Sequence, residues 1–307
     1  ALNIQLNTSG SHGALQFAGS TGSSSLLSGI ISISGTIDLS DTGITGFTRD
    51  DGKNNEFTGT LSGSSAKIEL ATGQYYGGNI GTAELGQGKG EIFRHQYIGL
   101  FAKTGTGASF SDVEIAGTVN VAPRKDGFYI GGLAAVVNDG ASVTNVDITE
   151  SMTIDMKNKQ EYVGGMFGLV DSNSSNNIEL KGNSSSDTLE IKPNITIKGT
   201  SADEQYIGGA IGNISSVKTF GIDLANVTVA TRLTSSRSGT DCAAGGLIGR
   251  IAGNSGSNTR TVNLNGVTVS GSTLTFTNAT SHTGGFLGYA WHNTNVVFEG
   301  SGLSVSG

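Results

Sequence analysis

The chain has 307 residues, of which 36% are hydrophobic, and this excludes a disordered polar chain and allows a substantial core. The formal net charge is −7 and the 18 basic residues are scattered, which argues against a nucleic-acid partner. No apolar run approaches the roughly 20 residues of a membrane span, and the single Cys242 excludes an internal disulfide. Because the N-terminus has no signal-peptide pattern, we expect a mature or excised piece of a larger protein.

Glycine, serine, threonine and asparagine dominate the polar part of the sequence. The 49 glycines are about twice the ordinary share. These small residues alternate with valine, isoleucine and leucine, which is the vocabulary of short strands and tight turns. Few stretches have the periodicity of an amphipathic helix. The composition therefore predicts an all-β protein.

In chain order, residues 1–53 come first and are interpreted as N-terminal strands that cap the remainder. Residues 54–70 read as a first coil, and residues 54–307 as one continuous repeat domain. From Tyr97 onward a motif of an aromatic residue, one or two glycines and small apolar residues recurs at intervals of 32 to 44 residues. Its marker glycines are Gly99, Gly131, Gly164, Gly208, Gly245 and Gly284. Periods of this size are typical of stacked supersecondary units.

Each copy contains three segments in the same order. A continuous apolar segment such as Tyr129–Val137 comes first and is typical of a buried parallel strand. A polar turn and an alternating segment with Val146 and Ile148 follow, and then a third short segment. Three strands per repeat predict a three-sided parallel β-solenoid with unequal turn loops. The recurring glycines would let each coil bend and stack on the next.

The repeats resemble a known family. "YIGLFA" from Tyr97, "YIGGLAAVVNDGASVTNVDI" from Tyr129 and "YVGGMFGLV" from Tyr162 are similar to GLUG-type repeats of large bacterial surface proteins. The resemblance covers roughly residues 54–307 and implies a right-handed parallel β-helix. Such repeats occur in adhesins and beside the catalytic region of immunoglobulin-A-cleaving zinc metallopeptidases. The chain departs from the family pattern at Leu100, which replaces the second glycine. It also departs at Ser62, Ser64 and Ser65, in the serine-rich stretch after "FTGTL" (residues 57–61).

No catalytic signature accompanies the repeat. A zinc peptidase needs H-E-x-x-H to place two imidazoles on one helix face. The four histidines, His12, His95, His282 and His292, do not form this motif. We therefore expect no catalytic residues and no metal site of this kind in the chain.

The second segment carries an acidic residue at nearly constant distance from the marker glycine in four successive copies. These residues are Glu114, Asp147, Glu179 and Asp223. Their alternation with apolar residues points the side chains outward. If the copies are in register, the four carboxylates form a column and repel one another. A divalent cation such as calcium, or another ligand, would reduce this repulsion. The alternative is an ordinary solvated face.

Other candidates for contact are aromatic residues and loops. Trp291 lies in the first turn of the last copy of the motif, where an exposed indole would be a contact point. The tyrosines that open the copies at positions 97, 129, 162 and 206 are interpreted as a stacked packing row, with sugar binding as the alternative if they are exposed. Asp112 and Asn145 are interpreted as structural residues that satisfy the backbone of turns. The longest loops, around 183–187 and 234–241, are the best candidates for specific contacts.

The sequence thus favours a non-enzymatic, extracellular module of a bacterial surface or secreted protein that acts in adhesion or as a display stalk. We expect a monomer without cofactor, whose partner is a host or environmental glycan or protein. Two alternatives stay open. The chain is an accessory substrate-binding domain of a large secreted peptidase, or a polysaccharide-active β-helix enzyme, which would bring carboxylates and a basic residue together on one face.

Overall fold

The computed structural model of the chain describes residues 30–38, 56–70, 74–75, 96–121, 128–138, 140–156, 160–171, 177–199, 202–216, 220–236, 239–253, 259–271, 273–276, 282–291 and 295–306. Every regular element in these ranges is a β-strand, which confirms the prediction of an all-β protein. The strands form three sheets.

Two of the sheets have six strands each. Sheet 1 consists of β4 (Gln96–Ile98), β7 (Phe128–Gly131), β11 (Gln160–Gly164), β16 (Ala202–Gly208), β20 (Gly239–Gly245) and β24 (His282–Gly284). Sheet 2 consists of β5 (Phe101–Thr104), β8 (Ala134–Val137), β12 (Phe167–Val170), β17 (Ile211–Ser216), β21 (Ile248–Gly253) and β25 (Leu287–Trp291). Each successive repeat of the sequence therefore adds one strand to each of these sheets.

Sheet 3 has 15 strands in two arms. The first arm contains β1 (Ile30–Asp38), β2 (Thr60–Leu70), β9 (Ala141–Ile148), β13 (Ile178–Lys181), β14 (Leu189–Ile191), β18 (Phe220–Val229), β22 (Thr259–Ser270), β26 (Asn295–Ser301) and β27 (Ser304–Ser306). The second contains β3 (Gln74–Tyr75), β10 (Ser151–Met156), β15 (Asn194–Gly199), β19 (Arg232–Ser235) and β23 (Thr273–Phe276). The long strand β6 (Ala108–Val121) belongs to both, because it pairs with β9 and with β10.

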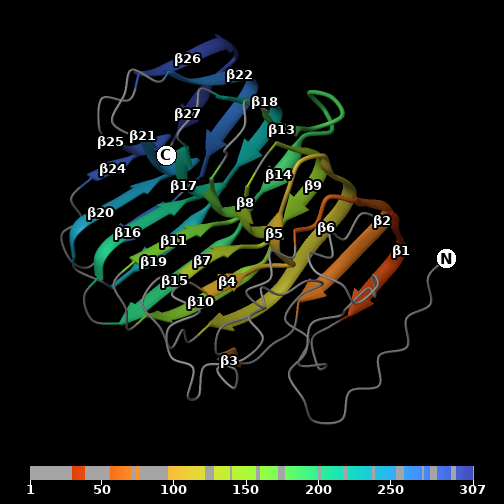
Figure 1. The fold of residues 1–307 in the computed structure, drawn as a ribbon, viewed down its shortest axis with the longest axis horizontal. Coiled ribbons are helices and arrows are strands. Elements are labelled where there is room, and N and C mark those ends of the chain that lie inside the picture. Colours follow the sequence, from red (N-terminus) through yellow and green to blue (C-terminus); the bar gives the residue numbers. More distant parts are fainter. Residues whose placement is uncertain are drawn as a thin grey trace.

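All named strand pairs are parallel. The colours of Figure 1 run in order from β1 at one end of the stack to β26 at the other, so neighbouring strands come from successive repeats. Parallel strands need long crossover connections, and here the other sheets supply them. The repeat period seen in the sequence is thus the chain length of one circuit through the three sheets.

One detail of the expected repeat is wrong. The apolar segment Tyr129–Val137 was expected as a single strand, but it divides into β7 and β8, which lie in different sheets. The chain bends between them at Gly132 and Leu133, both buried. The bend recurs in each described repeat, at the glycine that follows the marker glycine or, in the first copy, at Leu100.

Sheets 1 and 2 form inner layers between the two arms of sheet 3. One apolar cluster joins sheet 2 to the first arm, and a second joins sheet 1 to β10, β15 and β19. A third cluster lies between sheets 1 and 2 and contains Tyr129, Tyr162, Tyr206, Val136 and Leu169. Because both faces of the inner sheets are covered, residues 129–137 are buried without interruption. This burial explains why the first segment of each repeat is continuously apolar.

The strands of the first arm bend where three non-glycine residues have positive φ. Asp112, Asn145 and Asn226 have φ values of 56°, 52° and 55°. The register places Asn226 beside Gly266, which has φ of 64° at the same bend. Asparagine and aspartate tolerate the left-handed region better than other side chains do, which supports the structural interpretation of Asp112 and Asn145.

The bend predicts different effects on stability for two substitutions at Asn226. Asn226→Ala should reduce the free energy of unfolding by about 1 kcal/mol, since alanine is strained at positive φ. Asn226→Gly should be nearly neutral, because glycine occupies the same bend in the next repeat at Gly266. Urea unfolding followed by circular dichroism measures both. Equal losses for the two variants would contradict the conformational explanation.

The predicted N-terminal cap, residues 1–53, is described only at β1. This strand pairs in parallel with β2 and extends the first arm of sheet 3. Residues 1–29 and 39–53 lie outside the described residues.

Candidate functional site

The expected column of four carboxylates is not formed. Glu114 pairs with Asp147, and Glu179 pairs with Asp223. Glu179, however, lies beside Ser142 rather than Asp147. The four residues therefore form two separate pairs, five positions apart along the strands, although all four side chains lie on the outer face of sheet 3 as expected.

The pair of Glu179 and Asp223 is occupied by neighbouring side chains. Lys181 Nζ lies 2.8 Å from Glu179 Oε2. Asn177 donates to Asp223 Oδ2 at 3.0 Å, and Asn263 donates to the other carboxylate oxygen, Oδ1. With its oxygens engaged in this way, the pair serves as a polar ladder between strands rather than as a free binding site.

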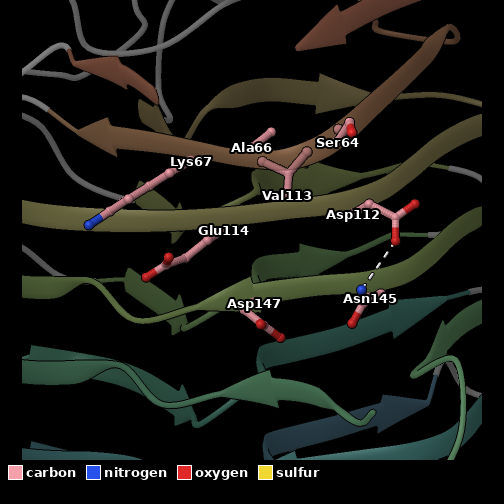
Figure 2. A pocket seen from close by; sticks show the side chains of 9 residues that line it. Ser64, Ala66, Lys67, Asp112, Val113, Glu114, Asn145 and Asp147 are labelled. Carbon is pink, nitrogen blue, oxygen red and sulfur yellow. Dashed lines mark hydrogen bonds between the residues drawn. The ribbon is translucent and has the colours of Figure 1, made fainter. Parts of the chain in front are cut away.

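The pair of Glu114 and Asp147 lies in an open hollow of about 610 Å³ on the outer face of sheet 3. Figure 2 shows its lining from three neighbouring strands, β2, β6 and β9. The hollow follows the bend of these strands, where Asn145 Nδ2 donates to Asp112 Oδ1 at 3.1 Å. The lining residues are Gly63, Ser64, Ala66, Lys67, Asp112, Val113, Glu114, Asn145 and Asp147.

A lysine lies in the same row across the strands as the two carboxylates. Lys67 is the register partner of Glu114, which in turn is the partner of Asp147, so three adjacent strands carry Lys67, Glu114 and Asp147 in one row. Adjacent strands are about 4.8 Å apart, which brings these groups within reach of one ligand. Lys67 Nζ also lies 3.6 Å from Glu69 Oε2. With Asp112, the lining holds three carboxyl groups and one ammonium group.

Each carboxylate of this row is held by one hydrogen bond from the fold. Thr149 Oγ1 donates to Glu114 Oε1 at 2.8 Å, and the backbone N–H of Glu190 donates to Asp147 Oδ1 at 2.8 Å. Burial raises the pKa of Asp147, and the nearby carboxylates of Glu190 and Glu114 raise it further, while the Glu190 N–H and Lys192 act in the opposite direction. The site therefore positions two carboxylate hydrogen-bond acceptors beside one ammonium donor.

The sequence alone did not identify Lys67, Ser64, Asp112 and Asn145 as lining residues. A register shift in the β2–β6 pair between Ser62 and Ala66 brings Lys67 beside Glu114. The serine-rich stretch after "FTGTL" was the available signal, since the departure from the repeat pattern falls at this bulge. The shift itself cannot be counted from the sequence.

The structure gives no support to a cation site. Within the described ranges there is no group of three or more histidine, cysteine, aspartate or glutamate residues placed to hold a metal ion. The calcium hypothesis depended on a continuous acidic column, and the strand register divides that column.

The tyrosine row is a packing feature. The rings of Tyr129 and Tyr162 stack at 5.1 Å, those of Tyr162 and Tyr206 lie 5.4 Å apart, and all three residues are buried. The guanidinium of Arg250, itself buried, lies 3.6 Å from the ring centre of Tyr206. Burial raises the pKa of Tyr162 to about 12. The side chain of Tyr97 lies outside what the structure describes.

Trp291 ends β25 and is half-buried rather than exposed. The guanidinium of Arg250 lies 5.1 Å from its ring, so the indole contacts the same cation that packs on Tyr206. Trp291 is far along the stack from the hollow, on another sheet, and the two candidates do not form one site.

The loop at 183–187 is a compact turn between β13 and β14. Ser184 and Asp187 exchange backbone hydrogen bonds at 3.2 Å, and Asn183 donates to the Asp187 carboxylate at 2.8 Å. The turn is followed by β14, which pairs with β9, one of the strands that line the hollow. Of the loop at 234–241, residues 237 and 238 lie outside the described residues.

Comparison with protein-family models, with curated proteins and with solved structures finds no match for this chain. In the part of the chain that the structure describes, no helix has the length and apolar character needed to cross a membrane.

Proposed function

We propose that this chain is a non-enzymatic, right-handed parallel β-helical module of a bacterial surface or secreted protein, and that it binds a glycan in the hollow of Lys67, Glu114 and Asp147. Three features support the β-helix: all strand pairs are parallel, successive repeats are neighbours, and each repeat visits the three sheets in the same order. Parallel crossovers are right-handed in nearly all proteins. The resemblance to GLUG-type repeats supports the bacterial, extracellular origin.

The observation that carries the binding function is the row of Lys67, Glu114 and Asp147 on three rigid strands. A sugar hydroxyl can donate a hydrogen bond to a carboxylate and accept one from an ammonium group. The row offers both kinds of partner. The strands are fixed by pairing on both sides, which lowers the entropy that binding must overcome. We propose that the module acts as a monomer, since the row needs residues from one chain only.

The binding function predicts a specific loss of affinity in a double variant. Glu114→Gln with Asp147→Asn should weaken glycan binding by about tenfold or more, because two charge-assisted hydrogen bonds are replaced by weaker ones. Binding is measured with the purified protein on a glycan array and then by calorimetry with the glycan that binds. The array should be run with and without calcium.

A matched control is available on the same face of sheet 3. Glu179→Gln with Glu299→Gln removes the same charge from the row that contains Asp223, outside the hollow. This variant should bind as the wild type does. Equal losses in both double variants, or binding that persists in the hollow variant, would contradict the assignment of the hollow.

A second function is favoured by one observation. The convergence of a lysine with two carboxylates, one of them with a raised pKa, is the arrangement expected of a polysaccharide-cleaving enzyme. The same glycans incubated with the protein separate the two functions. New reducing ends or unsaturated sugars that disappear in the hollow variant would indicate an enzyme, and binding without product supports the module.

A further inference from the structure

Glu150 is an acidic residue buried at the joint between the two arms of sheet 3. It lies between β9 and β10, and its side chain has no exposed surface. Neither carboxyl oxygen has a hydrogen-bond partner among the described residues. An ionised carboxylate in such a place is very unfavourable, whereas a neutral acid costs much less.

The carboxyl group packs against the turn that joins sheets 1 and 2. A Cβ atom built on Gly132 would lie 2.3 Å from Glu150 Oε1, so the carboxyl group fills the space that a side chain at Gly132 would need. In the next two repeats this corner is occupied by Pro193 and then Thr231, which lie against Gly165 and Gly209. Glu150 is thus the acidic member of a row whose other described members carry no charge.

Among the residues that the structure describes, no charged group offsets this burial. The residues on either side of it, Thr149 and Ser151, and the facing turn at Gly132 and Leu133 are uncharged. Burial alone raises the pKa of Glu150 well above its ordinary value of 4.5. The carboxyl group therefore stays protonated in the folded protein at pH values where an exposed glutamate is ionised.

We propose that Glu150 is a pH-sensitive latch: as a neutral acid it holds the joint of sheet 3 against the Gly132 turn, and its ionisation opens this contact. The sign follows from the direction of the shift. The closed state is fully favoured below the ordinary pKa, and it loses stability as the pH rises toward the raised pKa of the folded state, because opening releases a proton. Above that value the loss is complete.

The latch also connects to the outer face. Thr149, next to Glu150, donates to Glu114 at 2.8 Å, and Asp147 lies in β9, three residues before Glu150. Opening at the joint therefore disturbs the hollow. Only this consequence rests on the proposed function, since the latch itself does not need a ligand.

The test is hydrogen exchange of the backbone amides, measured by mass spectrometry between about pH 5 and about pH 9 and corrected for the intrinsic rate. In the wild type, the opening constant of peptides that cover residues 128–137 and 146–153 should rise by up to about tenfold per pH unit. In Glu150→Gln this pH dependence should disappear. Glu299→Gln, which removes an exposed carboxylate on β26, at the other end of the first arm, should keep the wild-type dependence.

Glu150→Thr serves as a second variant, since threonine stands at the equivalent corner at Thr231, and it should also lack the pH dependence. It decides the question if the glutamine variant does not fold. Wild-type peptides with no pH dependence, or the same dependence in the wild type and a Glu150 variant, would overturn the latch. Because no ligand is used, either result is independent of whether the hollow binds a glycan.

Discussion

Gly209→Ala should reduce the free energy of unfolding by about 3 kcal/mol or more. A Cβ atom at this position would lie 2.0 Å from the carbonyl oxygen of Gly246 and 2.3 Å from Thr231 Oγ1. The carbonyl belongs to the turn of the next repeat, which is fixed by its own strands and cannot move away alone. The repeats must therefore separate or distort, and urea unfolding followed by circular dichroism measures the cost.

The same substitution at the equivalent glycine of the last repeat is the control. A Cβ atom at Gly285 would meet only Val305 Cγ1, at 3.0 Å, since no further described repeat covers this turn. Gly285→Ala should therefore change the stability by less than about 1 kcal/mol. If the two variants lose similar stability, close approach between repeats is not the reason why glycine recurs at this position in successive repeats.

The second large effect is expected for Tyr206→Ala, at about 3 to 5 kcal/mol. Tyr206 is fully buried between sheets 1 and 2 and packs against Tyr162. Its ring also lies 3.6 Å below the guanidinium of Arg250. Truncation would leave a cavity and would remove the nearest aromatic face from a buried charge. Chemical unfolding of the purified variant gives the loss directly.

Tyr206→Phe separates the ring from the hydroxyl group. The phenyl ring preserves the volume and the aromatic face toward Arg250, so most of the stability should remain. A loss as large as that of the alanine variant would mean that the hydroxyl group, rather than packing, stabilises the junction of the two inner sheets. That result would contradict the interpretation of the tyrosine row.

The proposed binding site depends on the rigidity of the stacked strands, which Gly209→Ala and Tyr206→Ala also test. Lys67, Glu114 and Asp147 stand on strands that pair on both sides, and the hydrogen bonds from Thr149 and the Glu190 N–H fix the two carboxylates. A site built in this way changes little when a ligand arrives, so most of the interaction energy is available for recognition. The proposed site therefore lies on paired strands rather than in a long loop.

The repeat of the sequence was a reliable guide to the fold for a physical reason. A glycine is needed in the turn at Gly165 or Gly209 because a Cβ atom there would lie 2.3 Å or 2.0 Å from a carbonyl oxygen of the next repeat, so no side chain fits. This requirement returns in each circuit, so it leaves a period in the sequence. The continuous apolar segment after it reports an inner sheet covered on both faces, as at residues 129–137.

The same period led to the wrong prediction of a continuous acidic column. Ser142 follows Val137 by five positions, whereas Glu179 follows the equivalent Val170 by nine. The connection from sheet 2 to sheet 3 is therefore longer in the later repeat, while the distance from the marker glycine to the acidic residue is nearly the same. Counting along the chain cannot distinguish a longer loop from a shifted strand, because both contribute the same number of residues.

The sequence by itself determined the class of fold: strands rather than helices, repeated circuits, and an outer face on which the acidic residues alternate with the core. These properties depend on local periodicity and on glycine contacts that recur in each circuit. Only the tertiary structure decided that the first segment bends into two sheets and that Lys67 stands beside Glu114 and Asp147. It also showed that Glu150 is enclosed against Gly132. Each of these depends on which residues become neighbours across strands, and loop lengths and a bulge set that register.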